Sequence, residues 1–442
     1  MANTYLTRTQ VAGNRQIFTQ SIWFKLTNTA DQIFISSYND ANNYNCFFLE
    51  SGNQVLQVLW KKSGSNAALL NTTRKFRDPS AWYHVVLAVD TTQGTAADRI
   101  KLYVNGVQET SFSTATYPNQ NESIEVNDNN TNQRIGALNT DTFFQGVASY
   151  VAQIDGTQEL PTVFGETDAT TGEWKLKTTI TPSVAWGNNG FLVLKDGNSL
   201  TDASPNSNNF TVAGGTLTKA EDCPSNVFPI FAGMYCPKSS TNAGAFLNGG
   251  TTVGGSPGDA SSIASMGARS GKYYWEIKVQ NATNTRSCGV VRSDSIDTSH
   301  GSGIYPGGNG NATIWTVAYN MVNGYVQKND NGTQSQVGSL ATLTTGDILG
   351  VALNLTDYEI KWYKNGSLVT TTSISADWVA DGNFLLPCNR MDGNQFVQYN
   401  FGNGYFASTA VSSAGTNASG NGIFEYDVPT GFTALSTKGL NL

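Results

Sequence analysis

The sequence predicts an all-β protein in which two antiparallel β-sandwich (jelly-roll) domains are joined by an irregular connector. Two strand-like segments, about 260 residues apart, each run into Asn-Gly, at Asn105-Gly106 and Asn365-Gly366. Asn-Gly favours positive φ at both central residues and so forms the tight turn of a β-hairpin. Because the two hairpins lie in different surroundings, they indicate two separate sandwiches. No segment has a convincing amphipathic pattern for a helix of three or more turns.

The first third of the chain has the rhythm of a sandwich, with short strands and turn signals every 8–12 residues. Residues 16–26 and 32–38 alternate, and 82–89 is apolar on both faces, as expected of a central strand covered on both sides. Residues 143–154 favour a strand over a helix, because Gly146 lies near the start and β-branched residues follow. We therefore expect a first domain over residues 1–160.

The rest of the chain divides where the composition changes. Residues 161–225 are irregular and rich in turn residues, and we expect them to form a connector with a few short strands. A second sandwich is expected over residues 226–442. Within it, residues 273–279 alternate cleanly, which places Tyr273 and Trp275 on one face and Tyr274 on the other.

The composition limits the classes of partner. Only 13% of the residues are charged, about half the average of roughly 25% for globular domains, and the net charge is −7. The densest basic stretch, residues 74–77, is too short to make a basic face. We therefore expect no nucleic-acid partner and no binding to an anionic membrane. No apolar run approaches the ~18 residues that would span a bilayer, so membrane insertion is not expected either.

The five cysteines show neither a Cys-x-x-Cys pair nor metal-ligand spacing. Cys46 and Cys388 lie in apolar sequence and are expected to be buried thiols. A disulfide between Cys223 and Cys236 stays open. This usage fits folding in a reducing cytoplasm. The first five residues lack the charged and apolar regions of a signal peptide.

Motifs in both halves resemble known families. Residues 1–160 resemble the laminin G-like, concanavalin A-like jelly rolls through the motifs at 82–85, 101–106 and 144–146. The last part of the chain resembles a SPRY domain through the motifs at 274–277, 346–351, 364–366 and 397–402.

The order of the parts is more specific than either half. A jelly roll, then Ile154-Asp155-Gly156, then the motifs at 164–168 and 171–175, then SPRY, is similar to virion proteins of tailed bacteriophages, especially marine ones. The resemblance covers nearly the whole chain. It implies a structural or adhesive particle component, in a tail fibre, a tail tip or the capsid surface, assembled with other virion proteins in the host cytoplasm.

This resemblance implies contact with a host surface glycan or protein through sandwich loops, multiplied by many copies. By analogy with fibres and spikes, which use cyclic symmetry, we expect a homo-oligomer and specifically a trimer. Three alternatives stay open: a purely structural virion docking protein, a cell-associated bacterial lectin or adhesin, and, less favoured, a polysaccharide depolymerase. Sequence alone does not separate adhesion from structural docking.

Concanavalin A-like sandwiches include glucan hydrolases, which need paired carboxylates about 5–5.5 Å apart. The nearest match is Glu166 and Asp168, but the next acid, Glu173, would face the other side of a strand. His84 sits in an apolar strand and is expected to be a hydrogen-bonded core histidine, and His300 lies in a polar loop. We expect no enzyme activity and no catalytic residue.

A metal site is also not expected, although calcium binding stays an open alternative. Calcium needs about six to eight oxygen ligands with several acids converging. The acids at loops and strand ends of the first domain form no tight Asp-x-Asp-x-Asp cluster; they are Asp31, Asp40, Asp90, Asp98 and Asp128.

Aromatic residues beside polar turns are the clearest indication of a binding site. Sugar rings stack on aromatic faces, and Asn and Asp side chains bind hydroxyl groups. Four such residues lie beside turns rich in Asn, Gly or Asp: Tyr305, Trp378, Tyr44 and Tyr117. They are the candidate ligand-binding residues, although most aromatic side chains in this chain are expected to pack in a core or between subunits.

Overall fold

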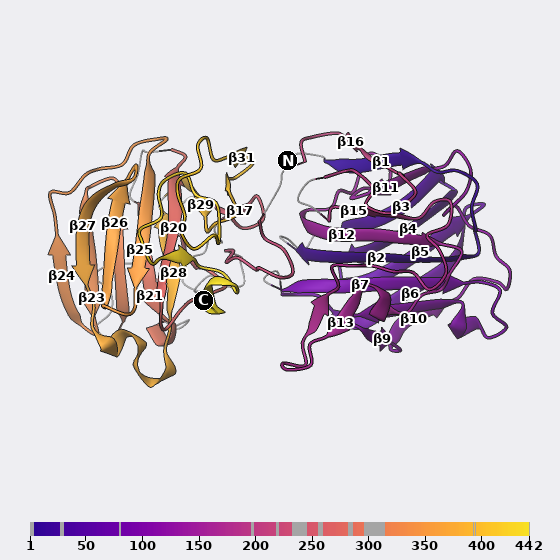
Figure 1. Ribbon diagram of the computed structural model, residues 1–442, viewed down its shortest axis with the longest axis horizontal. Helices are drawn as coiled ribbons and strands as arrows, with labels where there is room; N and C mark the ends of the chain where they lie inside the picture. The colour runs from indigo at the N-terminus through magenta and orange to yellow at the C-terminus, as the bar shows by residue number, and fades with distance from the viewer. Residues whose placement is uncertain are drawn as a thin grey trace. The chain divides into compact units, whose positions relative to one another are not determined.

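The computed structural model describes residues 4–26, 31–78, 81–195, 199–217, 221–231, 245–254, 260–281, 286–295, 314–391, 393 and 395–441. Contacts divide the chain between residues 219 and 226 into two compact units. Each unit is built from two large, mainly antiparallel sheets, and the helical elements among the described residues are short 3-10 turns (Figure 1). The predicted all-β fold with two sandwiches is confirmed. Among the described residues, no helix is long and apolar enough to cross a membrane.

The first sheet of the first unit has eight strands in the order β10-β6-β5-β4-β3-β11-β1-β16 (Figure 1). These strands are β1 (Tyr5–Thr9), β3 (Gln32–Asp40), β4 (Asn43–Glu50), β5 (Val55–Lys62), β6 (Ser65–Lys75), β10 (Phe112–Thr116), β11 (Asn132–Ile135) and β16 (Thr211–Ala213). Their inner side chains meet those of the second sheet in a core that includes Phe24, Phe34 and Trp60.

The second sheet of this unit has six strands in the order β15-β12-β2-β7-β8-β9. They are β2 (Ile17–Leu26), β7 (Trp82–Asp90), β8 (Ile100–Val104), β9 (Val107–Glu109), β12 (Gly146–Asp155) and β15 (Phe191–Val193), and η1 (Ala96–Asp98) precedes β8. The strand predicted near residues 143–154 is therefore present as β12. The central position predicted for residues 82–89 is also confirmed, since β7 lies between β2 and β8.

Residues 161–225 do not form a separate connector, because most of this segment packs onto the first unit. β15 pairs with β12, and β16 pairs with β1. Between η2 (Pro161–Val163) and β15, a hairpin of β13 (Gly165–Thr167) and β14 (Trp174–Leu176) follows. Phe164 and Leu192 join Val86 and Ala88 of β7 in a small apolar cluster. The predicted connector thus covers the second apolar face of β7.

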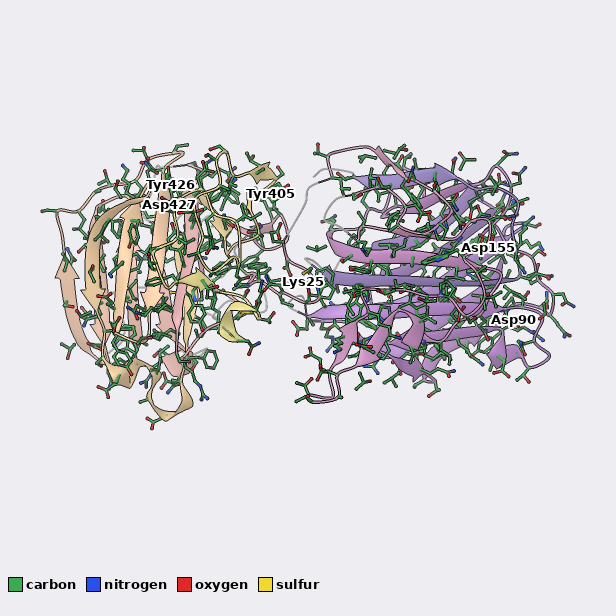
Figure 2. The ribbon with its side chains drawn as sticks, viewed as in Figure 1. Lys25, Asp90, Asp155, Tyr405, Tyr426 and Asp427 are labelled. Carbon is green, nitrogen blue, oxygen red and sulfur yellow. The ribbon has the colours of Figure 1, made fainter. Side chains whose placement is uncertain are left out.

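A buried polar network ties the two sheets of the first unit together at one end. Asp155, at the end of β12 (Figure 2), accepts hydrogen bonds from the Asn14 amide at 2.8 Å, from Asn127 Nδ2 at 2.9 Å and from the Asn189 amide at 3.1 Å. Burial raises the pKa of the Asp155 carboxyl. Because the hydrogen bonds join loops to strand ends, they hold this end of the sandwich rigid.

The second unit has a sheet of eight strands and a sheet of six. The larger sheet contains β17 (Ala245–Leu247), β18 (Thr252–Gly254), β20 (Lys272–Val279), β25 (Ile348–Asn354), β26 (Glu359–Lys364), β27 (Ser367–Ser373), β29 (Phe396–Asn400) and β32 (Thr433–Ala434). The smaller contains β19 (Ala260–Ile263), β21 (Arg286–Arg292), β22 (Trp315–Asn320), β23 (Tyr325–Asp330), β24 (Thr333–Val337) and β28 (Leu385–Met391). Short elements complete it: η4 (Ser293–Ser295), η5 (Ala376–Gly382), β30 (Tyr405–Phe406), β31 (Thr409–Ala410) and η6 (Gly439–Asn441).

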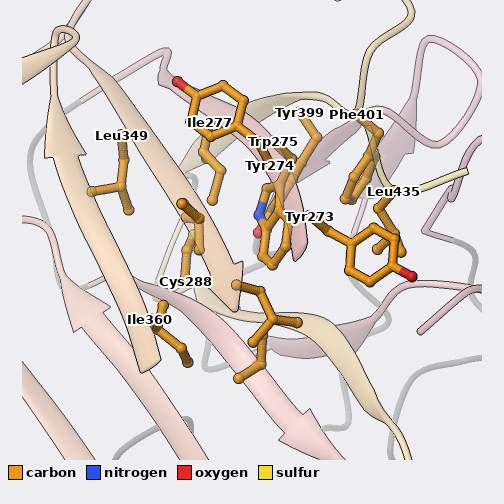
Figure 3. Packing of buried hydrophobic residues seen from close by; sticks show 14 of the residues in the cluster. Tyr273, Tyr274, Trp275, Ile277, Cys288, Leu349, Ile360, Tyr399, Phe401 and Leu435 are labelled. Carbon is orange, nitrogen blue, oxygen red and sulfur yellow. The ribbon is translucent and has the colours of Figure 1, made fainter. Parts of the chain in front are cut away.

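The core of the second unit is centred on β20. Trp275 and Ile277 are fully buried beside Tyr399 (Figure 3), which confirms the predicted alternation. Glu276, on the opposite face of the strand, is also fully buried. Its carboxylate accepts hydrogen bonds from the backbone amides of Glu425 and Tyr426, both at 2.8 Å. The C-terminal segment therefore covers the face of β20 that sequence alone left open.

Both Asn-Gly hairpins form as predicted and use the same device. Asn105 and Asn365 have φ near +47° and +49°, and the glycines that follow them have φ near +81° and +80°. The backbone amide of Asn105 donates to the carbonyl of His84, and Asn105 Oδ1 accepts the backbone amide of His84. Asn365 makes the same pair of hydrogen bonds with Ile348.

The cysteine predictions are confirmed where the structure describes the residues. Cys46 and Cys388 are buried free thiols, and burial raises the pKa of each. Cys223 is free and half-buried, while Cys236, its suggested partner, lies outside the described residues.

Candidate functional site

His84 is enclosed in a stack of aromatic rings and has no exposed surface. Its ring lies 4.6 Å from that of Trp23 and 6.0 Å from that of Trp174, centre to centre. Trp174 Nε1 donates to His84 Nδ1 at 3.0 Å, so the ring proton is on Nε2, which faces Ser21 Oγ at 2.9 Å. A protonated Nε2 cannot take the serine proton, and burial lowers the pKa of His84 to about 3. The prediction of a hydrogen-bonded core histidine is confirmed, and His300 lies outside the described residues.

The carboxylates considered for hydrolysis lie on an exposed hairpin. Lys175 Nζ is 3.4 Å from Glu166 Oε1 and 3.1 Å from Asp168 Oδ2. The backbone amides of Thr171 and Thr170, and then Lys175, lower the pKa of Asp168. A general acid needs the opposite shift.

The acids considered for calcium are engaged by their own neighbours. Asp31, Asp40 and Asp90 accept backbone amides of Ser51, Asn42 and Thr92, while Asp98 and Asp128 pair with Lys101 and Arg15. Within the described part of the chain, no group of three or more His, Cys, Asp or Glu side chains could hold a metal ion.

The four aromatic candidates lie in different settings. Tyr305 is outside the described residues. Trp378 is fully buried, its Nε1 donates to Asp330 Oδ1 at 2.6 Å, and its ring meets that of Trp315 edge to face. It has no free face for a ligand, so the prediction for Trp378 is corrected. Tyr117 is half-buried and packs against the core of the first unit.

Tyr44 lies in a row of side chains on the outer face of the eight-stranded sheet. The strand register places Lys61 opposite Tyr44, Tyr44 opposite Tyr38, Tyr38 opposite Asn132, and Asn132 opposite Thr9. Directly opposed residues in antiparallel strands project on the same face. We call these five residues, Thr9, Asn132, Tyr38, Tyr44 and Lys61, the tyrosine row.

The tyrosine row has an ordered aromatic centre. The rings of Tyr38 and Tyr44 stack with centroids 5.9 Å apart and an angle of 23° between their planes. The guanidinium carbon of Arg134, from the next row on β11, lies 5.6 Å from the centre of the Tyr38 ring. Both tyrosines are half-buried, so each keeps some exposed surface. Burial raises the pKa of Tyr44, and its hydroxyl therefore stays protonated at neutral pH.

Apolar side chains support the tyrosine row from beside it. Ile33, Cys46 and Phe48 are buried on this face and form a cluster, against which Tyr44, Leu59 and Leu138 pack. The apolar contacts restrict the rotamers of Tyr44. A restricted ring loses little entropy when a ligand binds.

A polar groove of about 410 Å³ extends the face beyond Asn132 and Thr9. It is lined by Thr7, Arg8, Thr9, Asn132, Ser207, Asn208, Asn209 and Thr211. The loop on its far side is held by Asp202, which accepts the amides of Leu192 and Asn208, each at 2.8 Å. Asn208 Nδ2 in turn donates to the carbonyls of Asn188 and Gly190. The groove is therefore walled by amides, hydroxyls and the Arg8 side chain, and the loop that bears Asn208 is held in place.

Sequence reasoning found Tyr44 but missed Tyr38, Asn132 and Arg134. One signal was available for Tyr38, because Tyr38 and Tyr44 flank the turn at 39–43 at positions that oppose each other in a hairpin. The place of β11 beside β3 comes from a pairing across about 100 residues, which the local sequence does not encode.

The fold and this face define a protein of two β-sandwiches with an aromatic, amide-rich sheet surface on the first. Residues 2–157 match the family described as the concanavalin A-like lectin/glucanases superfamily, and residues 272–403 match the SPRY domain family. The chain thus contains a laminin G-like/concanavalin A-like domain and a SPRY domain, as their motifs predicted. Both domain types suggest a binding or adhesive role. No curated protein matches the chain.

Solved structures resemble parts of the chain at low identity. The SPRY domain of human HERC1 is 20% identical, with a TM-score of 0.28, over 38% of this chain and 96% of that one. A SAP-like pentraxin from Limulus polyphemus is 14% identical, with a TM-score of 0.26, over 34% and 69%. The carbohydrate-binding module CBM66 from Bacillus subtilis is 12% identical, with a TM-score of 0.25, over 38% and 91%. At these TM-scores, the three structures carry no argument about what this chain binds.

Proposed function

We propose that this chain is a non-enzymatic binding protein whose first unit holds a carbohydrate on the outer face of its eight-stranded sheet. The stacked pair of Tyr38 and Tyr44, set in a row with Asn132 and Thr9, is the observation that carries the proposal. Sugar rings present C–H faces that pack on aromatic rings, and they present hydroxyls that pair with amide and hydroxyl side chains.

The surroundings of the row suit an extended ligand. The groove continues from Asn132 and Thr9 toward Asn208 and Asn209, so a chain of several sugar units has polar partners along its length. The loop that bears Asn208 is already held by Asp202. Binding therefore needs little ordering of the protein, which favours affinity.

A non-enzymatic role is supported by the composition of the tyrosine row. The tyrosine row contains one charged residue, Lys61, and no carboxylate. Hydrolysis of a glycosidic bond needs two carboxyl groups that flank it. A depolymerase would have to place both groups elsewhere on the chain.

For the biological setting, we propose a virion component of a tailed bacteriophage, in a tail fibre, a tail tip or the capsid surface. The order of the two domains and the motifs between them support this setting. The chain would assemble with other virion proteins in the host cytoplasm. It would form a homo-oligomer, a trimer by analogy with fibres and spikes. Many copies would multiply a weak site into firm attachment.

The binding proposal is tested with purified full chain titrated against panels of polysaccharides by calorimetry. Tyr38→Ala and Tyr44→Ala are each expected to weaken binding about fivefold or more, because a lost aromatic contact is worth about 1 kcal/mol or more. Tyr117→Ala, a half-buried tyrosine off the row, is the matched control. Equal binding by all three variants and wild type would place the ligand elsewhere.

The virion setting is tested separately. Antibodies against the purified chain, used with gold on intact particles, should label the virion and show which appendage bears it. Label on host cells alone would favour the cell-associated lectin, and label on virions with no polysaccharide binding would favour structural docking.

A further inference from the structure

Arg134 lies beside the tyrosine row, mostly buried and without a carboxylate partner among the described residues. The residue is only 8% exposed. Its Nη1 donates to the Leu138 carbonyl at a long 3.4 Å, and its Nε has no hydrogen-bond partner within the described part of the chain. No carboxylate among the described residues pairs with it within 4.0 Å.

Arg8, on the opposite face of the same sheet, is a buried arginine with hydrogen-bond partners and serves as a comparison for Arg134. It is 9% exposed, yet its Nε donates to Gln133 Oε1 at 2.9 Å and its Nη2 to Asn189, while the charges of Asp202 and Asp155 act on it. Arg8 is therefore paired and Arg134 is not.

A buried charge without a counter-ion is costly, and the Tyr38 ring offsets only part of that cost. Register places Arg134 opposite Thr7 and Ser36, so its side chain is on the same outer face as the tyrosine row. An anion bound at this face would supply the missing partner, and guanidinium binds carboxylate and sulfate oxygens through paired N–H groups.

Resting on the proposed function, we infer that the carbohydrate on the tyrosine row is acidic. Its anionic substituent, a carboxylate or a sulfate ester on the sugar, is the counter-ion of Arg134. Lys61, three strands away at the end of the row, is a second cation for a further substituent along the polysaccharide. Asp40, the one acidic residue of β3, is engaged by Asn42 and Asn43 and does not serve Arg134.

The overall charge makes such binding selective. The chain carries −7, so a polyanion is repelled by the molecule as a whole and gains only where local cations face it. Attraction of a polyanion to this protein is therefore a property of the site, and removal of one cation should abolish it.

The test titrates the full chain with three polysaccharides by calorimetry: dextran (neutral), polygalacturonate (carboxylate) and dextran sulfate (sulfate). We expect one acidic polymer to bind about tenfold or more tightly than dextran, because a charge-assisted hydrogen bond is worth that factor. Arg134→Gln should remove the preference. Lys101→Gln, on β8 of the other sheet where Lys101 pairs with Asp98, should leave it unchanged.

The outcomes separate the inference from the proposed function. Binding of either acidic polymer that depends on both Arg134 and Tyr38 supports the inference and identifies the anionic group. Equal binding of dextran that depends on Tyr38 overturns the inference and keeps the proposed function. Acidic binding that is insensitive to Tyr38 also overturns it, and no binding to any polymer overturns both. If Arg134→Gln does not fold, Lys61→Gln and the comparison of polymers on wild type decide the question.

Discussion

Acidification should move the stabilities of the two units in opposite directions, because each unit buries one group with a strongly shifted pKa. In the first unit, burial lowers the pKa of His84 from 6.5 to about 3. In the second, burial raises the pKa of Glu276 from 4.5 to about 7, although two backbone amides, Tyr274 and Asn400 donate to it.

The signs follow from proton uptake. Below pH 6.5 the unfolded first unit binds a proton at His84 that the folded unit refuses, so its stability falls as the pH falls. Between pH 7 and 4.5 the folded second unit holds a proton on Glu276 that the unfolded unit has lost, so its stability rises as the pH falls. One pKa unit corresponds to about 1.4 kcal/mol. From pH 7 to pH 5, His84 therefore removes about 2 kcal/mol from the first unit, and Glu276 adds about 2 kcal/mol to the second.

Scanning calorimetry of the full chain at pH 7 and pH 5 measures both effects. For units of this size, about 2–4 °C of melting temperature corresponds to 1 kcal/mol, so each transition should shift by about 4–8 °C, and the two shifts should be in opposite directions. Asp155 and Glu125, whose pKa values burial raises, oppose His84 within the first unit. His84→Gln and Glu276→Gln isolate the two groups, and each should lose the shift of its own unit. Equal shifts in wild type and in both variants would refute the reasoning.

Further perturbations follow from single contacts. Trp174→Phe removes the donor to His84 Nδ1 and should cost the first unit about 1–3 kcal/mol in denaturant unfolding. Trp23→Phe is the comparison, because the Trp23 ring also stacks on His84 while its Nε1 has no hydrogen-bond partner among the described residues. Gly106→Ala should destabilise that unit and do so less in the Trp174→Ala background, since a Cβ there would lie 2.5 Å from the Trp174 ring while φ of +81° stays unfavourable. Asp202→Asn should free the groove loop, with faster amide exchange at Asn208 and weaker polysaccharide binding, and unchanged exchange would contradict the role assigned to Asp202.

Local chemistry explains what the sequence predicted of the fold. The Asn-Gly turns, the alternation at Trp275 and the doubly apolar β7 all depend on residues within one or two strands, and all are present. The attachment of residues 161–217 to the first unit depends on contacts such as Trp174 with His84, 90 residues away in sequence. Strands of three residues between polar turns carry too little pattern to indicate such contacts.

The candidate site shows the same division. A turn rich in polar residues correctly indicated that Tyr44 lies at the surface, but the same rule selected Trp378, which is buried. The Trp378 indole donates a hydrogen bond to Asp330, 48 residues away in sequence, and is buried in the core. Arg134 gave no sequence signal, because what distinguishes it is a missing partner, and partners are known only once β1, β3 and β11 are side by side.

The central claim, that carbohydrate is bound on the outer face of the eight-stranded sheet, is tested most directly by where the ligand protects the chain. Hydrogen exchange with and without a bound polysaccharide should show slower exchange in the turn at 39–43 and in the loop at 204–209, which border the tyrosine row and its groove. Protection confined to the second unit, or none at saturating polysaccharide, would contradict the claim.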